Sequence, residues 1–236
     1  CNNNSLMVKY KNKYNLTNTN YFIYVPDNYK IDFEQYFKYY IDNENNINYD
    51  NLIHLCIMVK NGGDQFESML KDNMDIIDRW TILDTGSTDN TVEIIQNYFS
   101  EKGIPGLLFV EPFKNFGYNR TVSFQKAQEL CKELNWNPEM TYTMTVDADM
   151  IIKPSPEFKN YKLTLPGYTV IQQNGSMKYY NSRFMQCAYN WKCIGATHEY
   201  WSGDPTAKIP FEIFYIDDVN DGGCKSDKFE RDIRLL

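Results

Sequence analysis

The sequence has 236 residues, with 31 acidic and 24 basic side chains and a formal net charge of −7. This length suffices for one main domain with a substantial hydrophobic core. The excess of acids, without any dense run of Lys or Arg, argues against nucleic acid as a partner.

No stretch approaches the roughly 18 uninterrupted apolar residues of a membrane-spanning helix, and the amino end CNNNSLMVKY is too polar for a signal peptide. The six cysteines show neither C-x-x-C nor zinc-ligand spacing, and several lie in apolar periodic segments, which favours reduced thiols. We therefore expect no transmembrane segment and a cytoplasmic location. Because the chain lacks an initial Met and ends in Leu235-Leu236, we also expect a fragment of a longer polypeptide.

Residues 1–50, rich in Tyr and Asn, predict an accessory amino-terminal segment, and residues 51–236 predict the main domain. From residue 51 apolar runs alternate with helical periodicity. Strands are expected at 52–60, 79–84, 106–113 and 141–147, and helices at 64–74, around Val92–Phe99 and around Ala127–Leu134.

This alternation is typical of an α/β fold with a doubly wound, mostly parallel sheet. Residues 157–215 contain short strand-like pieces and predict a smaller mixed β region, and KSDKFERDIRLL near the end predicts a helix start. Ligands of such sheets bind at the carboxyl ends of the strands. Asn61, Asp84 and Asp147 follow or end predicted strands, so we expect the site there.

The pair Asp147-Ala148-Asp149 ends the fourth predicted strand. Carboxylate oxygens suit Mg²⁺ or Mn²⁺, which proteins commonly hold with one or two acids plus substrate phosphates. In extended backbone the two side chains would point to the same side. A bare D-x-D is more often a solvated turn, but its position at a strand end favours a metal site.

Two further segments carry candidate chemistry. The stretch DTGSTDNT at 84–91 is either a well-capped strand-to-helix turn or a turn whose first acid accepts hydrogen bonds from a ribose or a base. In GATHEYW, His198 and Glu199 offer a metal ligand and a proton acceptor beside two aromatic rings, although a lone His is more often a packed or surface residue.

The ordered segments KNGGDQFESML, ILDTGSTDNTVEII, FGYNRTVSFQKA, VDADMII, GATHEYW and DGGCKSDKFERDIRLL resemble family 2 glycosyltransferases with the Rossmann-like GT-A fold. The resemblance covers about residues 52–236 and is nearest to the lipopolysaccharide-core glucosyltransferase branch, whose relatives carry a helical repeat region after the catalytic domain. It implies a nucleotide-binding half at 51–150 and an acceptor half at 151–236. The Asn-rich composition suggests a giant-virus member, located in the host cytoplasm or the virion.

The resemblance also implies roles for single residues. It makes Asp149 the metal-binding acid, Asp147 an acid near the ribose or the water shell of the metal, His198 a further metal ligand and Glu199 the general base. The implied donor-binding residues are Lys60, Asn61, Asp84, Asn119, Arg120, Asp147, Lys225 and Lys228. Many relatives carry a His before a Gly pair near the end of the domain, where this chain has Asp217, Asp218 and Asp221, so the group that completes the metal site is left open.

The implied activity is metal-dependent, inverting transfer of a hexose from a nucleotide sugar, with UDP-glucose expected from its frequency in the family, to a hydroxyl of a glycan, lipid or protein. Three other readings stay open. A nucleotidyltransferase would normally carry a basic, Gly-rich phosphate loop after the first strand, and Asn61-Gly62-Gly63-Asp64 lacks those bases. A sugar-nucleotide-binding module without turnover and a structural partner within a larger chain are the others.

Overall fold

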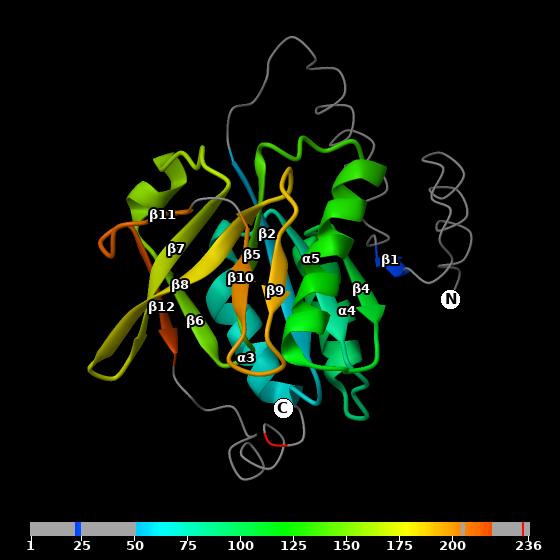
Figure 1. Ribbon diagram of the computed structural model, residues 1–236. Coiled ribbons are helices and arrows are strands. Elements are labelled where there is room, and N and C mark those ends of the chain that lie inside the picture. Colours follow the sequence, from blue (N-terminus) through cyan, green and yellow to red (C-terminus); the bar gives the residue numbers. More distant parts are fainter. Residues whose placement is uncertain (1–21, 25–50, 204–205, 219–232, 234–236) are drawn as a thin grey trace.

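The computed structural model describes residues 22–24, 51–203, 206–218 and 233, and Figure 1 shows their mixed α/β arrangement. The helices are α3 (Gly63–Asn73), α4 (Thr91–Lys102) and α5 (Phe116–Glu133), with short 3-10 helices η2 (Met74–Ile76) and η3 (Pro156–Asn160). The strands are β1 (Phe22–Tyr24), β2 (Leu52–Val59), β3 (Arg79–Asp84), β4 (Gly106–Val110), β5 (Thr141–Thr145), β6 (Met150–Pro154), β7 (Gly167–Asn174), β8 (Met177–Gln186), β9 (Lys192–Ile194), β10 (Tyr200–Ser202), β11 (Thr206–Lys208) and β12 (Phe214–Asp218).

The large sheet has the order β1-β4-β3-β2-β5-β8-β7-β12-β6, with β11 paired to β7. Strands β4, β3, β2 and β5 are mutually parallel, and they are the four strands expected from the apolar runs. Strand β4 ends at Val110 rather than near 113. The reason is local, because Pro112 has no backbone N–H to continue the ladder.

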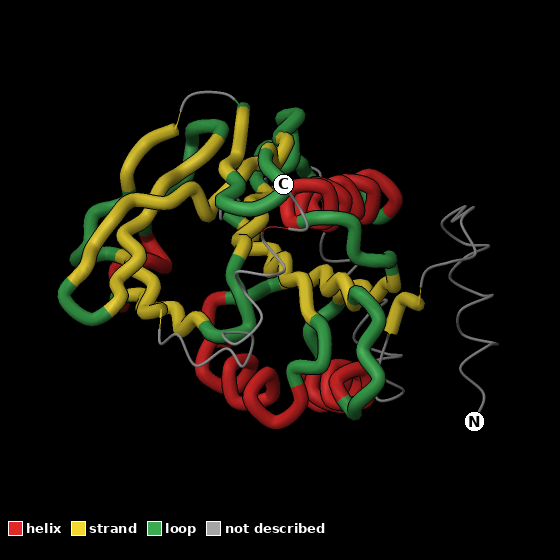
Figure 2. Tube along the Cα trace, turned by 60° about the horizontal axis from the view of Figure 1, so that its bottom comes forward, coloured by secondary structure: helices red, strands yellow, loops and turns green. Residues whose placement is uncertain are grey.

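Helices cover both faces of this parallel half, as Figure 2 shows. Helices α3 and α4 bury Phe66 and Ile95 in the main core against one face. Helix α5 buries Leu130 against Phe109 on the opposite face. Strands buried on two sides need apolar residues at nearly every position, which is why their sequences lack alternation. The predicted doubly wound α/β class is confirmed.

The other half of the sheet is mixed. Strand β8 is antiparallel to both β5 and β7, and β12 is parallel to β7 and antiparallel to β6. The predicted mixed β region is therefore a continuation of the same sheet. Strands β9 and β10 form a separate hairpin against α5, where the Thr121 hydroxyl accepts a hydrogen bond of 2.9 Å from the backbone N–H of Cys193.

Only part of the two chain ends is described. Strand β1 pairs antiparallel with β4, while the rest of residues 1–50 and the terminal segment that holds Lys225 and Lys228 lie outside the described residues.

No helix in the described ranges is long and apolar enough to cross a membrane. Cys56, Cys131, Cys187 and Cys193 are buried free thiols, as expected for those four positions.

Candidate active site

Asn61 and Asp84 hold the turn that follows β3. The Asn61 carboxamide accepts a 2.8 Å hydrogen bond from the N–H of Thr88, and the Asn61 N–H donates to the Ser87 hydroxyl at 2.8 Å. The Asp84 carboxylate, only 2% exposed, accepts from the N–H groups of Gly86 and Ser87 at 3.1 and 3.0 Å. Both predicted donor-binding residues therefore shape the backbone of this edge, and contact with a nucleotide stays a prediction.

Asn119 and Arg120, which were predicted together as donor-binding residues, have different contacts in the structure. Asn119 is buried and holds the loop after β4, because its amide donates to the carbonyl of Pro112 at 3.1 Å and accepts from the N–H of Lys114 at 2.8 Å. Arg120, one residue further along α5, points at acids. Lys60, another of the predicted donor-binding residues, has an exposed side chain.

Arg120 joins two of the predicted acids. Its Nε donates to Oε1 of Glu199 at 2.7 Å, and its Nη2 donates to Oδ1 of Asp147 at 2.6 Å. The Arg120 side chain is 9% exposed, the Glu199 side chain 17% and the Asp147 side chain 31%. Burial lowers the pKa of Arg120, but Asp147 and Glu199 together raise it above its ordinary value. The guanidinium therefore stays charged and bridges Asp147 to Glu199, which lies 79 positions after Arg120 in the chain.

A second arginine, which the sequence analysis missed, lies on the other side of Asp147. Nη1 of Arg183, on β8, is 4.0 Å from Oδ2 of Asp147. Burial raises the pKa of Asp147, but Arg120 and Arg183 outweigh burial and hold it below the ordinary value of 3.8. The signal was present, since a charge inside the strand-like RFMQCA needs a buried partner.

The backbone around the acidic pair differs from the expectation. The extended geometry predicted for Asp147-Ala148-Asp149 is wrong, because the N–H of Met150 donates to the carbonyl of Asp147 at 3.1 Å and closes a turn. The inference that both carboxylates face one ligand because the backbone is extended therefore does not apply. Asp149 is partly exposed, one residue before β6 begins.

The loop of His198 and Glu199 is fixed on the first turn of α5. The N–H groups of Phe116 and Gly117 donate to the carbonyls of Ala196 and Gly195, at 3.2 and 3.1 Å. His198 has φ +53°, a left-handed conformation that non-glycine residues rarely adopt. Its side chain is exposed, while that of Glu199 turns toward Arg120.

The described part of the chain contains no group of three or more His, Cys, Asp or Glu side chains arranged to hold a metal ion. The residues present still fit a divalent cation that has only one or two protein ligands. Asp149 offers hard oxygen ligands at the surface, and Mg²⁺ commonly binds one or two carboxylates, with waters and substrate phosphates completing its shell. Asp147 is engaged by arginine, and the metal role predicted for it and for His198 stays untested.

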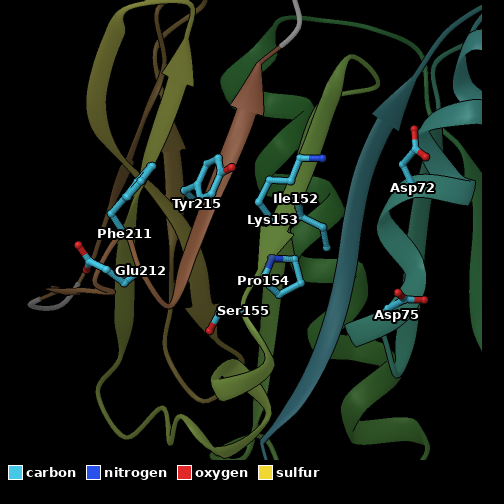
Figure 3. A pocket seen from close by; sticks show the side chains of 9 residues that line it. All are labelled: Asp72, Asp75, Ile152, Lys153, Pro154, Ser155, Phe211, Glu212 and Tyr215. Atoms are coloured by element: carbon cyan, nitrogen blue, oxygen red, sulfur yellow. The ribbon is translucent and has the colours of Figure 1, made fainter.

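A pocket of about 440 Å³ lies away from these residues, between η2 and the C-terminal end of α3 on one side and the 211–215 segment and β6 on the other (Figure 3). None of the predicted site residues lines it. Its aromatic wall offers little free ring surface, because the Phe211 ring stacks on Tyr215 at 4.5 Å and has the ammonium of Lys178 3.9 Å from its centroid. We therefore place the candidate site at the carboxyl edge and not in this pocket.

No protein-family model and no curated protein matches this chain. Among solved structures it is similar to S. aureus TarS 1-349 in complex with UDP-GlcNAc, with a TM-score of 0.39 and 14% identity over 53% of this chain and 35% of that one. It is also similar to glucosyl-3-phosphoglycerate synthase from Mycobacterium tuberculosis in complex with Mn²⁺, UDP and glucosyl-3-phosphoglycerate, with a TM-score of 0.33 and 17% identity over 53% of this chain and 45% of that one. The chain spans less than half of either protein, and at these TM-scores their activities are not transferred to it.

Proposed function

We propose that this chain is a metal-dependent, inverting glycosyltransferase of family 2 with a GT-A fold, which moves a hexose from a nucleotide sugar, UDP-glucose first, to a hydroxyl group. The observation that carries the proposal is the bridge formed by Arg120 between Asp147 and Glu199. It brings Glu199, the acid of GATHEYW, to the edge where the acidic pair follows β5. Together with the ordered motifs, this bridge supports a role for Glu199 as a base beside the proposed donor site.

Glu199 has the geometry of a general base. Arg120 fixes Oε1, and none of the described residues donates a hydrogen bond to Oε2. The acceptor hydroxyl loses its proton as its oxygen attacks the anomeric carbon, and a carboxylate within hydrogen-bond reach takes that proton. One displacement from the face opposite the diphosphate inverts the anomeric configuration.

Asp149 would hold the cation, and Asp147 would lie beside it. A bound divalent ion supplies charge neutralisation to the departing diphosphate. The turn at 84–91 and Asn61 would border the nucleoside, because both lie at the end of neighbouring parallel strands. Lys225 and Lys228 remain proposed phosphate contacts, and the acceptor is proposed to be a glycan, lipid or protein.

The test is release of nucleotide from a panel of UDP- and GDP-sugars with Mn²⁺, with and without EDTA. We expect turnover by the wild type that EDTA stops. Asp149→Asn should lower kcat by at least about 100-fold, and Glu199→Gln should lower it similarly while UDP still binds. Thr164→Ala, far from the edge, is the control for handling of variants. Retention of metal-dependent turnover by Asp149→Asn would show that the metal assignment is wrong.

One observation favours a second candidate, a sugar-nucleotide-binding module without turnover. Glu199 is already engaged by Arg120, and a base held in an ion pair is less available for a proton. In that case calorimetry would detect binding of a UDP-sugar, while no condition of metal or acceptor would release UDP.

A further inference from the structure

Two neighbouring tyrosines on β8, Tyr179 and Tyr180, differ in what covers their rings. They are 40% and 45% exposed, and as successive strand residues they point to opposite faces of the sheet. The ring of Tyr180 has the ammonium of Lys208 4.1 Å from its centroid. Within the described part of the chain, the ring of Tyr179 has neither an aromatic nor a cationic partner, and its hydroxyl forms no hydrogen bond. The Tyr179 ring is therefore the uncovered one of the pair.

The face of the sheet that carries Tyr179 leads to the candidate site. Gln172 lies directly opposite Tyr179 in the β7–β8 pair, and directly opposite residues share a face. The Gln172 carboxamide accepts from Nη2 of Arg183 at 2.6 Å and donates to Oδ2 of Asp218 at 2.8 Å. Arg183 in turn has its Nη1 4.0 Å from Oδ2 of Asp147. A continuous set of polar side chains therefore runs from Asp147 to the residue opposite Tyr179.

The charges of this polar set act on Tyr179. Partial burial raises the pKa of the Tyr179 phenol, and the carboxylates of Asp218 and Asp147 raise it further, while Arg183 opposes them. The phenol is therefore a neutral hydrogen-bond donor at neutral pH. Figure 1 shows that the β7–β8 turn, the end of β12 and the loop before β10, which holds Glu199, lie at the same end of the molecule. A molecule bound at Tyr179 would thus lie at the end where the proposed base is.

A saccharide suits this combination of groups. The nonpolar C–H face of a sugar ring packs on an aromatic ring, and its hydroxyls form hydrogen bonds with phenol, carboxamide and carboxylate groups. An acyl chain would instead leave such polar groups without hydrogen bonds. A serine or threonine side chain offers one hydroxyl and no flat nonpolar face. The chemistry around Tyr179 therefore favours a saccharide over a lipid or a protein side chain.

We propose that Tyr179 binds the acceptor and that the acceptor is a saccharide. The ring of Tyr179 packs on one face of the sugar, and its hydroxyl donates to a sugar oxygen. This inference rests on the proposed function. It goes beyond that function by choosing one acceptor class among three and by naming a residue that contacts the acceptor without taking part in the chemical step.

The test measures nucleotide release with Mn²⁺ from the nucleotide sugar that the wild type hydrolyses fastest. Release without an acceptor tests the proposed function alone. The acceptors are then glycosides of glucose, galactose, mannose and N-acetylglucosamine, with dioctanoylglycerol as the lipid and a serine-containing peptide as the protein probe. We expect the saccharides to accelerate release and to appear as glycosylated products in mass spectra.

The role of Tyr179 is tested by its variants in the same assay. Tyr179→Ala should raise the acceptor KM by about 10-fold, because the ring contact is lost, with a smaller change in the donor KM. Tyr179→Phe keeps the ring and should recover most of that loss. Tyr180→Ala is the matched control, since this tyrosine is adjacent, similarly exposed and on the other face. It should leave the acceptor KM within about 2-fold of the wild-type value.

The outcomes separate the inference from the proposed function. Equal acceptor KM values in the Tyr179→Ala and Tyr180→Ala proteins would overturn the role of Tyr179. Donor hydrolysis without transfer to any saccharide, or transfer only to the lipid or the peptide, would overturn the saccharide class and leave the proposed donor chemistry intact. A wild type that releases no nucleotide from any donor would overturn the proposed function and the acceptor role of Tyr179 with it.

Discussion

Buried arginines lie at opposite ends of the same sheet, and their positive charges have different partners at the two ends. At the amino end, the Arg79 guanidinium lies 3.6 Å from the centroid of the Trp136 ring, beside His54. At the carboxyl edge, Arg120 and Arg183 meet the carboxylates of Asp147 and Glu199. An aromatic face gives a cation a fixed partner, whereas carboxylates give it partners that a ligand or a metal can change.

The histidine at the amino end is held neutral. Burial, and then the charge of Arg79, lower the pKa of His54 from 6.5 to about 3. At the carboxyl edge the same kind of environment holds Asp147 ionised, because its arginines outweigh burial. The comparison shows a neutral histidine in the core at the amino end and an ionised acid at the carboxyl edge, and the second is what the proposed function requires.

The largest expected effect comes from breaking the bridge at the carboxyl edge. Arg120→Met removes the cation that Asp147 and Glu199 share, and removal of one partner from a buried ion pair costs about 3 kcal/mol or more. Urea denaturation should show this loss in the free energy of unfolding. The control is Lys126→Met, whose pair with Glu129 is a surface i,i+3 pair worth under about 1 kcal/mol. Equal losses for both variants would contradict a buried bridge.

A smaller effect is expected from the packing that brings Glu199 to Arg120. A Cβ on Gly117 would overlap the carbonyl oxygen of Gly195, in the loop that leads to Glu199. Gly117→Ala should therefore displace this loop and cost roughly 2 kcal/mol. Thermal unfolding and kcat should both fall. Gly106→Ala, another crowded glycine but at the amino end of β4 against the Trp80 ring, should lower stability without affecting kcat to the same extent. A Gly117→Ala protein with wild-type stability and kcat would show that the loop does not depend on this contact.

The amino-end cluster predicts a pH dependence of stability. Because the folded pKa of His54, about 3, lies below its ordinary value of 6.5, the unfolded chain binds a proton more readily between these values. Stability should fall as pH drops below about 6.5, with a slope of at most about 1.4 kcal/mol per pH unit. His54→Gln should remove this slope. His198→Gln, at the only other histidine in the sequence, should leave it in place. The same slope in His54→Gln would refute the assignment.

The smallest expected effect concerns the turn after β3. Asp84→Ala removes the acceptor for the N–H groups of Gly86 and Ser87, which should cost about 1 kcal/mol because water can reach the exposed Gly86. Asp84→Asn keeps one acceptor oxygen and should cost less. Denaturation curves of the two variants measure the difference, and an Asn variant that is less stable than the Ala variant would argue against the turn-holding role.

The parallel half of the fold follows from local sequence. A run such as LIHLCIMV is apolar because both faces of β2 are covered, and the Asn61-Gly62-Gly63 turn ends it. The mixed half was harder to predict from the sequence. The antiparallel pairing of β5 with β8 joins distant segments, and apolar periodicity does not show that these segments pair.

The candidate site, too, could be predicted from the sequence only in part. Asp84, Asp147 and Glu199 stand out as acids at predicted strand ends or in a distinctive loop, and the fold brings the last two to one arginine. Arg183 could not be paired with Asp147 without the β5–β8 register, and the turn at Asp147 depends on one backbone hydrogen bond to Met150 that side-chain patterns do not specify.

The most direct test of the carboxyl-edge site is a Mn²⁺ titration followed by electron paramagnetic resonance in the presence of UDP. It compares the wild type with Asp149→Asn and Asp147→Asn. The proposed arrangement predicts Mn²⁺ binding by the wild type, loss of at least about 10-fold in affinity for Asp149→Asn and a smaller loss for Asp147→Asn. Wild-type affinity in the Asp149→Asn protein would contradict it.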